Sequence, residues 1–527
     1  MKTFTFEHEE LGIGKLTGVI TPENVVQFQS IPYATIPGRF KQSILLETLS
    51  GTDRDFTKPG PASPQTFPST IHDGGPHPDD GDPSTPPSTS EFNCLILNLN
   101  VPLSTLTSLS SPTTPTLLPI LLYIHGGGFI LGRIDAAHNT AYITSQSLSS
   151  HQPTITASIQ YRLGALGSLY LPSDPSAANR CLYDQRNALL WMQRFVRGFG
   201  GDAGRVTLFG ESAGALSICA HMLSRGSVLV DSGGSGKKKK ALFNRVVLMS
   251  GVLGPATMPV SVGKAEEVYE EFMGRVGVRE SGEEGLRRVR EEVAVERIVE
   301  VTREMGERGT LWWPTLTEGW FGGEKVKKGG LTWDTVADAL AACEWVDGVV
   351  LGCTGFEGTS SMDKVSNITP RDFLAGIQDQ LGPESAALIS KAYQITPDMD
   401  PNLFITRAMR WWGDVLFDAP THALSNALSR TNKKTYRYIF TIRNPFPSHP
   451  LYQLSHHWVD IYFVFKTFHF RYPSQRLKDL STRHAQLWVE FANGEAPWRA
   501  YDGGEGVVMV ADERDGWVER RKTSNSR

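Results

Sequence analysis

The chain of 527 residues is 40% hydrophobic and 20% charged, and its 52 Lys and Arg against 56 Asp and Glu give a formal net charge of −4. The apolar content is ample for a large core, and the near balance of charge excludes the long-range field that draws proteins to nucleic acid or an anionic membrane. Residues 1–18 carry charges where a signal peptide needs an apolar segment, and the longest apolar run, 117–124, is far too short to span a bilayer. We expect a globular protein with no nucleic-acid partner and no membrane span.

The cysteines are an odd number, lie far apart and form no C-x-x-C pair. A disulfide framework and a cysteine zinc site both need closely patterned cysteines, so neither is predicted. This usage favours a cytoplasmic protein. The cysteines are Cys94, Cys181, Cys219, Cys343 and Cys353.

Short apolar segments rich in β-formers recur along the chain, several with Gly, Pro or Asn beside them. We expect strands at 25–28, 95–99, 117–124, 154–160, 206–209, 246–249, 349–351 and 436–442. Between many of them lie longer stretches, such as 184–196 and 213–223, whose apolar residues recur every three or four positions as in helices. This alternation predicts an α/β fold with a central, mostly parallel sheet, helices on both faces and an antiparallel edge made by the earliest strands.

Insertions and a peripheral layer interrupt the pattern. Three stretches lack the apolar side chains that offset the entropy of ordering, so we expect flexible loops at about 66–90, 103–115 and 227–240. Residues 262–345 contain highly charged segments of helical periodicity, which predict a peripheral, lid-like helical region. We expect one domain over 1–511 and a frayed tail over 512–527.

The motif Gly-Glu-Ser-Ala-Gly at 210–214 has the form G-x-S-x-G, which by itself is a weak signal in a chain rich in Gly and Ser. Its context is more informative, because a predicted strand precedes it and a predicted helix follows. A strand, a sharp turn and a helix expose the central serine at the carboxyl end of a sheet. Ser212 is therefore a candidate nucleophile, with an ordinary Gly-Ser turn as the alternative.

A second glycine-rich turn, His-Gly-Gly-Gly-Phe at 125–129, follows the predicted strand at 117–124. Consecutive glycines free backbone N–H groups, and acyl transfer needs such donors about 3 Å from the developing oxyanion. We expect the N–H groups of Gly127, Gly128 and Ala213 to form an oxyanion hole. A phosphate site is the alternative, but the turn lacks G-x-G-x-x-G, and the Gly-Lys at 236–237 lacks the Ser or Thr of a P-loop.

Together with other stretches, these motifs resemble the type-B carboxylesterase/lipase family, and within it an intracellular fungal-type member. Matching stretches occur in order along almost the whole chain, and the C-terminal half matches more thinly. They are FQSIPYA at 28–34, NCLILN at 93–98, HGGGF at 125–129, YRLG at 161–164, LYDQ at 182–185, FGGD at 199–202, GESAG at 210–214, FEG at 356–358 and GD at 413–414. The resemblance implies an α/β-hydrolase fold and a serine esterase with no metal or organic cofactor.

The resemblance also implies the catalytic residues. Ser212 matches the nucleophile, Glu357 the acid, and His457 the base, with Asp460 three residues beyond it as in the family. The order Ser, Glu, His is the one expected of α/β-hydrolases.

Alternatives stay open for two of these residues. Asp363 or Glu344 can replace Glu357 as the acid, and the adjacent His456 can replace His457 as the base. The histidine pair is not predicted to bind a metal, because no H-E-x-x-H motif or third ligand accompanies it.

Three residues are candidates for the substrate pocket: Phe129, Glu211 and Trp458. Trp458 stands where the family generally has a small glycine, so its indole is expected to narrow the cavity or to shift the histidine. A further departure is Ser63, which replaces the cysteine that usually pairs with Cys94 and so agrees with a reducing compartment.

The predicted reaction is cleavage of a small apolar or neutral carboxylic ester through an acyl-Ser212 intermediate. A neutral imidazole takes the serine proton and later protonates the leaving alcohol, while the acid orients the ring. Two other functions stay open. One is an acyltransferase or cyclase that passes the acyl group to a hydroxyl other than water, and the other is a non-catalytic binding module on the same fold.

Overall fold

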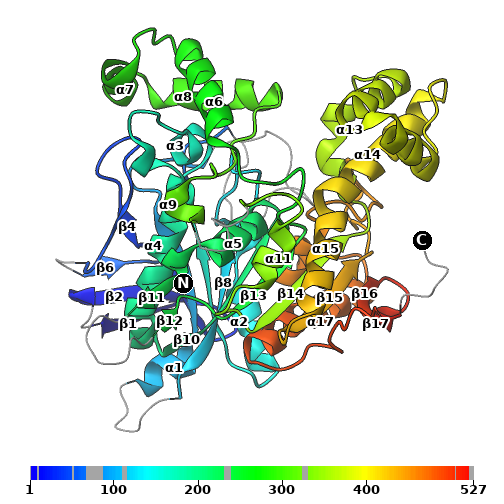
Figure 1. Cartoon of the computed structure of the whole chain (residues 1–527). Coiled ribbons are helices and arrows are strands. Elements are labelled where there is room, and N and C mark those ends of the chain that lie inside the picture. Colours follow the sequence, from blue (N-terminus) through cyan, green and yellow to red (C-terminus); the bar gives the residue numbers. More distant parts are fainter. Residues whose placement is uncertain are drawn as a thin grey trace.

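One large sheet runs through the computed structural model, which describes residues 2–8, 11–49, 53–66, 87–109, 116–230, 239–322, 330–504 and 506–521 (Figure 1). Its strands, in the order in which they pair, are β1 (Lys2–His8), β2 (Ile13–Ile20), β3 (Val25–Pro32), β7 (Ile96–Pro102), β9 (Ile155–Ile159), β8 (Leu118–Ile124), β10 (Gly201–Glu211), β13 (Arg245–Met249), β14 (Gly348–Thr354), β15 (Lys434–Phe440), β16 (Val508–Asp512) and β17 (Gly516–Arg520). The short strand β6 (Arg54–Asp55) pairs with β2.

The parallel centre of the sheet and the antiparallel edge of the earliest strands are as predicted, and a second antiparallel edge was not predicted. Strands β9, β8, β10, β13, β14, β15 and β16 pair in parallel, whereas β1, β2, β3 and β7 form one antiparallel edge and β17 forms the other. Every residue of β8, β9 and β14 is buried. Strands that are covered on both faces read as continuous apolar runs, which is why the sequence marks them clearly.

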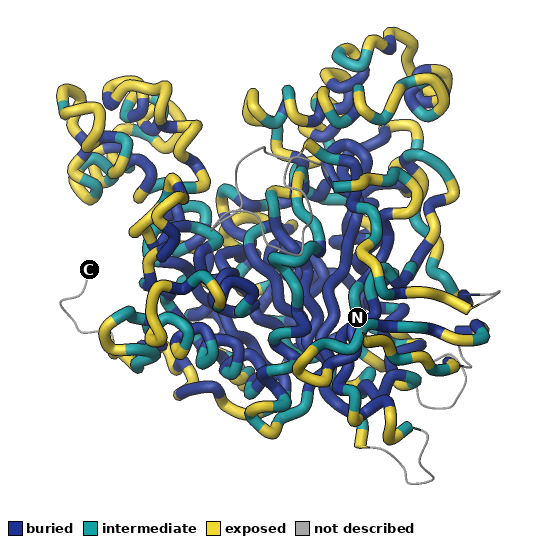
Figure 2. Tube along the Cα trace, turned by 180° about the vertical axis from the view of Figure 1, so that it is seen from behind, coloured by how far each residue is buried: buried dark blue, intermediate teal, exposed yellow. Residues whose placement is uncertain are grey.

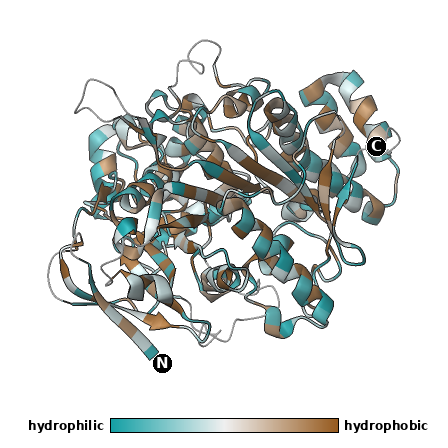
Figure 3. Cartoon of the chain, turned by 90° about the horizontal axis from the view of Figure 1, so that it is seen from below, coloured by the Kyte–Doolittle hydropathy of each residue, from teal (hydrophilic) through white to brown (hydrophobic). Residues whose placement is uncertain are grey.

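Helices cover both faces of the sheet and divide the interior into two cores. From β8, Ile120 and Leu122 pack into the core that contains α4 (Arg180–Phe195) and α5 (Ala213–Leu223). Leu121 and Tyr123 pack into the core that contains α16 (Val459–Phe465) and α17 (Gln475–Ala492). Successive side chains of a strand point to opposite faces, and in Figure 3 hydrophobic segments lie along the central strands. The predicted α/β fold with helices on both faces is confirmed.

Two groups of helices stand above the sheet in Figure 1, and Figure 2 shows them as largely exposed. The first group contains α6 (Val262–Arg275), α7 (Gly282–Glu291) and α8 (Val295–Glu307), which lie within the predicted peripheral region 262–345. From the same region, α11 (Val336–Ala341) instead packs into the main core. The second group contains α13 (Pro370–Tyr393) and α14 (Pro401–Gly413), which lie outside the predicted region.

Several segments predicted as loops are regular. The expectation of a frayed tail over 512–527 is wrong for 516–520, because β17 pairs with β16 and Trp517 packs against Tyr438 and Trp498. The stretch 103–115 begins with the helix α1 (Leu103–Ser108), and the stretch 227–240 contributes to a hairpin of β11 (Val228–Val230) and β12 (Lys239–Ala241). The predicted loop positions 67–86, 110–115 and 231–238, and the tail beyond 521, lie outside the described residues.

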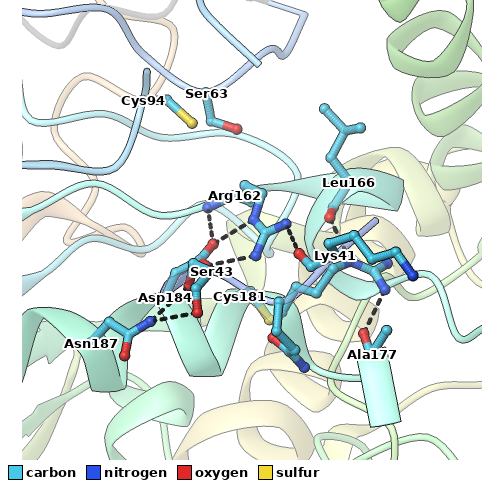
Figure 4. Close-up of polar contacts among 12 residues, drawn as sticks. Lys41, Ser43, Ser63, Cys94, Arg162, Leu166, Ala177, Cys181, Asp184 and Asn187 are labelled. Carbon is cyan, nitrogen blue, oxygen red and sulfur yellow. Dashed lines mark hydrogen bonds and ion pairs between the residues drawn. The ribbon is translucent and has the colours of Figure 1, made fainter. Parts of the chain in front are cut away.

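All five cysteines are buried and have free thiols. Cys94 lies beside Ser63 (Figure 4), so the serine occupies the place of a bridging partner. Within the described ranges, no helix combines the length and the hydropathy that a membrane crossing requires.

Candidate active site

The turn between β10 and α5 carries Ser212. The residue adopts φ 55° and ψ −121°, its backbone N–H donates to Met249 O at 2.9 Å, and it is partly exposed. Such a conformation is strained for a residue with a Cβ and is typical of a sharp turn that presents a functional side chain. Gly214 allows the close packing, because a Cβ there would lie 2.0 Å from Ile124 O. Ser212 thus stands at the carboxyl end of β10, against the end of β8.

The glycine-rich turn after β8 provides backbone donors beside Ser212. Gly127 and Gly128 adopt φ 103° and 62°, and a Cβ on Gly127 would lie 2.2 Å from Leu131 O, so only glycine fits there. The N–H groups of Gly127, Gly128 and Ala213 have no acceptor among the described residues. Ala213 is the first residue of α5, where backbone donors lack partners within the helix. These donors are available to a bound oxyanion.

The segment that follows β9 supports this turn from behind. Tyr161 Oη donates to His125 O at 2.7 Å, and Gly164 N donates to Phe129 O at 2.7 Å. Arg162 lies between these two donors and is held by a buried ion pair with a residue of α4 (Figure 4). Its Nε and Nη2 atoms donate to the two carboxylate oxygens of Asp184 at 2.8 and 2.7 Å. The pair therefore fixes the segment that holds the glycine turn.

We expect Asp184→Asn to destabilise the fold by about 3–5 kcal/mol, because it leaves the Arg162 guanidinium buried without its countercharge. Thermal unfolding followed by circular dichroism measures the change. The matched control is Asp379→Asn, an exposed residue on α13, for which the expected change is within about 0.5 kcal/mol. Equal melting temperatures for the two variants would contradict this prediction.

Glu357 and His457 form a close pair at the ends of neighbouring strands. Glu357 Oε2 lies 2.5 Å from His457 Nδ1, and Glu357 Oε1 accepts hydrogen bonds from Ser250 Oγ at 2.6 Å and from Thr354 N at 2.5 Å. Burial alone would raise the pKa of Glu357, but the nearby His457 and these donors hold the pKa below its ordinary value. The ionised carboxylate therefore faces Nδ1 of the imidazole.

The neighbouring candidates do not share this geometry. His456 is buried, its Nδ1 donates to His457 O at 2.5 Å, and its Nε2 lies 2.9 Å from Asn444 Nδ2. Asp363 and Glu344, the alternative acids, are both exposed. Of the residues that the sequence left open, the structure brings together Glu357 and His457.

Glu211, expected at the pocket, instead lies beside the histidine. Its side chain is fully buried and its Oε1 atom is 3.1 Å from His457 Nε2. The imidazole is thus placed between two carboxylates, with Glu357 at Nδ1 and Glu211 at Nε2. Ser212 Oγ makes no hydrogen bond to any described residue, so the contact between serine and histidine is open in this conformation. Catalytic hydrogen bonds of unliganded enzymes often tighten only when substrate binds.

Comparison with known proteins decides the family. A model of the Carboxylesterase family matches residues 8–519, which include all of these site residues. The chain belongs to the carboxylesterase family. It is a carboxylic ester hydrolase of the serine class, and neither the acyltransferase nor the binding-module alternative is supported.

Individual relatives of this carboxylesterase agree with the family. Lipase 3 of Yarrowia lipolytica is 28% identical over 90% of this chain and 86% of its own. Carboxylesterase 1C of Rattus norvegicus is 27% identical over 82% of this chain and 75% of its own. Among solved structures, a PNB esterase superposes with a TM-score of 0.73 at 24% identity, covering 97% of this chain and 96% of the other, which confirms the α/β-hydrolase fold.

The pocket candidates of the carboxylesterase take different places. Phe129 is buried in a narrow apolar cavity that Leu216 and Trp313 also line. Trp458 is half-buried, adopts φ 80° and packs edge-on against His138 with ring centroids 5.6 Å apart. A Cβ on Gly126 would lie 2.9 Å from the Trp458 indole and 2.9 Å from Glu211 Oε2, so the indole covers Gly126 next to that carboxylate.

A hollow of about 980 Å³ opens beside the glycine-rich turn and the turn that carries Glu357. Ile130 and Leu131 of the glycine turn form part of its wall, and residues of α8 form another part. Ser360 also lines it, next to Thr359, whose Oγ1 atom accepts from His457 N at 3.3 Å. The hollow borders residues next to the glycine turn and next to the turn of the acid, but neither the catalytic residues nor the three pocket candidates line it.

Two more buried carboxyl groups surround the pair. Burial and the charge of Glu357 raise the pKa of Asp460 to about 7 and, together with Asp414, that of Asp418 to about 8. Tyr438 Oη donates to Asp460 Oδ2 at 3.0 Å. Environments that push the pKa values of neighbouring carboxyl groups apart give them different roles. Here the pKa of Glu357 is lowered while those of Asp460 and Asp418 are raised.

Sequence reasoning assigned no role to two residues of this site. Ser250 follows β13 directly and donates to Glu357, and a polar residue at the carboxyl end of a neighbouring parallel strand is a signal that points to it. Phe417 stacks on His457 with ring centroids 4.5 Å apart. Its sequence carries no comparable signal, because a phenylalanine in a helix is usually core.

Proposed function

We propose that this carboxylesterase cleaves neutral carboxylic esters through an acyl intermediate on Ser212, with His457 as general base and Glu357 as the group that orients it. The observation that carries the proposal is the 2.5 Å contact between Glu357 Oε2 and His457 Nδ1. This contact lies at the carboxyl ends of the parallel strands, as does the turn that carries Ser212. Three backbone donors beside the serine, which have no acceptor in the part of the chain that the structure describes, complete the site.

The reaction follows from these positions. His457 Nε2 takes the proton of Ser212 Oγ as that oxygen bonds to the ester carbonyl, and the oxyanion accepts from Gly127, Gly128 and Ala213 N–H. Each such donor typically contributes about 3–4 kcal/mol to lowering the barrier. The Nε2 proton then passes to the alcohol oxygen as the carbon–oxygen bond breaks. Water repeats the sequence against the acyl-serine and releases the carboxylic acid.

The surroundings support a neutral substrate. The hollow beside the glycine turn has apolar walls at Ile130, Leu131 and Leu163, and its charged wall residues have both signs, as Arg303 and Glu307 illustrate. Such a mixture gives no selection for either sign of charge on the substrate. An apolar or neutral ester fits this lining.

The alcohol leaves on the side of Trp458. The leaving oxygen receives its proton from His457 Nε2, which lies 3.1 Å from Glu211 Oε1. The Trp458 indole and the Glu211 carboxylate both lie against Gly126. Trp458 therefore limits the size of the alcohol. Its left-handed backbone, costly for a bulky residue, suits glycine.

We expect Trp458→Gly to raise kcat/KM for esters of bulky alcohols over methyl esters of the same acid by about 10- to 100-fold, since filling or clearing a pocket is worth about 1–3 kcal/mol. The assay compares methyl and cyclohexyl butyrate, with a second series that varies the acyl chain at a fixed alcohol. Trp333→Gly, at a 65% exposed tryptophan, is the matched control. An equal gain in kcat/KM across the acyl series would contradict the placement of Trp458 on the alcohol side.

The function is tested by incubating the purified chain with a p-nitrophenyl butyrate series and, separately, with a fluorophosphonate probe, followed by peptide mapping. We expect turnover to butyric acid and a label on Ser212. A label on another residue would overturn the assignment of the nucleophile. Butyrate transferred wholly to an added alcohol, with no acid formed, would replace hydrolysis by acyl transfer.

The free thiols of the five cysteines support a location in the cytoplasm. Five buried free cysteines, one of them beside Ser63 in place of a partner, suit a reducing compartment. Cell fractionation with an antibody to the chain tests this, and recovery from the medium would contradict it.

A further inference from the structure

One long helix contacts both the acid and the base. It consists of α14, the π-helical turn η8 (Asp414–Asp418) and α15 (Ala419–Ser429), and its backbone stays right-handed helical at both junctions, Gly413 and Ala419. A π turn inside an α-helix changes the direction in which the next side chains project and is frequent at functional sites. In this chain the turn lies directly beside the catalytic pair.

The helix first contacts the turn that carries the acid. A Cβ on Gly413 would lie 3.1 Å from Glu357 Cβ and 2.7 Å from Gly358 N, and a Cβ on Gly358 would lie 1.7 Å from Met409 O. Backbone therefore packs on backbone at this point, and the two glycines are needed for the approach. The position of Glu357 is fixed relative to this helix.

Four residues further on, the same helix contacts the base. Phe417 is 6% exposed, and its ring stacks on the His457 imidazole with centroids 4.5 Å apart and planes 28° from parallel. The hydrogen bond between Nδ1 and Glu357 fixes one ring atom but constrains the tilt of the imidazole plane less strongly. A flat contact on the ring face restricts this tilt, because tilting would drive the imidazole edge into Phe417.

The orientation of the imidazole plane matters because Nε2 can face either Glu211 or Ser212. Glu211 Oε1 is 3.1 Å from Nε2, and Ser212 is the next residue along the chain. In this conformation Nε2 contacts Glu211, so the imidazole must shift from Glu211 to Ser212 to accept the serine proton, and it can do so only if its plane keeps its present direction. We propose that Phe417, presented by the π turn, is a positioning residue that holds the imidazole plane so that Nε2 reaches Ser212. The inference rests on the proposed roles of Ser212 and His457.

The test separates the flat ring from simple packing. Phe417→Leu keeps apolar bulk but removes the stacking face, whereas Phe417→Tyr keeps the face. We expect Phe417→Leu to lower kcat on p-nitrophenyl butyrate by about 10- to 100-fold with KM nearly unchanged, and Phe417→Tyr to restore most of the rate, since small misplacements of a catalytic group cost up to about 100-fold. The rate of fluorophosphonate labelling should fall in parallel with kcat.

Phe404→Leu is the matched control, because Phe404 is a 1% exposed phenylalanine on the same helix that packs against Phe373. It should lower the melting temperature but leave kcat unchanged. If Phe417→Leu is too unstable to assay, Phe417→Met supplies the same comparison with a flexible side chain. Full kcat in Phe417→Leu or Phe417→Met, a loss confined to KM, or an equal loss in Phe404→Leu would overturn the inference. Wild-type labelling at Ser212 shows separately whether the proposed function holds.

Discussion

Replacing Ser212 with alanine is expected to lower kcat for a short-chain ester by about five to six orders of magnitude, because no other group can form the acyl bond. The backbone donors remain, so a small rate above that in water should persist. Both serine and alanine carry a Cβ and bear the same strain at φ 55°, so the variant should fold with an unchanged melting temperature.

Steady-state kinetics on p-nitrophenyl butyrate measures this loss, and the fluorophosphonate probe should no longer label the protein. Ser261→Ala is a suitable control, because Ser261 caps the peripheral helix α6 and is exposed. That variant should keep its label and its kcat. Persistent labelling of Ser212→Ala would assign the nucleophile to another residue.

The substitution Glu357→Gln is expected to lower kcat by about four orders of magnitude, because it favours the wrong tautomer of His457. In the structure, Ser250 Oγ and Thr354 N both donate to Glu357 Oε1. In the glutamine variant the amide oxygen takes this position, because it alone accepts hydrogen bonds. The amide NH₂ then faces His457 Nδ1, which must act as an acceptor, so the proton moves to Nε2. An imidazole protonated at Nε2 cannot take the proton of Ser212.

The assay compares kcat of Glu357→Gln with that of Glu344→Gln and Asp363→Asn, the exposed acids that the sequence left as alternatives. Both controls should stay within about threefold of wild type, as surface substitutions usually do. Retention of activity in Glu357→Gln, with its loss in either control, would show that another carboxylate orients the base. A proton NMR signal of His457 would report the tautomer directly.

Local patterns were sufficient for the centre of the fold and for the turn that carries Ser212. The strands β8 and β14 are buried throughout and read as mostly apolar runs, and the change from strand to helix periodicity frames Ser212 within a few residues. Glycine at 127 is likewise a local signal, since its left-handed backbone leaves no space for a side chain.

The charge-rich C-terminal segment misled the same reasoning. Its composition suggests a frayed tail, yet Trp517 packs on Tyr438 from a strand some eighty residues earlier, and this contact orders β17. One partly buried tryptophan outweighs several exposed charges, because the charges stay in water when the strand forms.

The sequence by itself determined the features that depend on adjacent residues: the turn that carries the serine, the glycine-rich turn and the positions of the central strands along the chain. Only the tertiary structure decided which of two adjacent histidines faces the acid, that Glu211 lies at Nε2, and that Phe417 stacks on the ring. Each of these contacts joins residues far apart in the chain and depends on the directions of side chains across separate elements. Sequence periodicity describes one element at a time, so it contains no information about the distance between two of them.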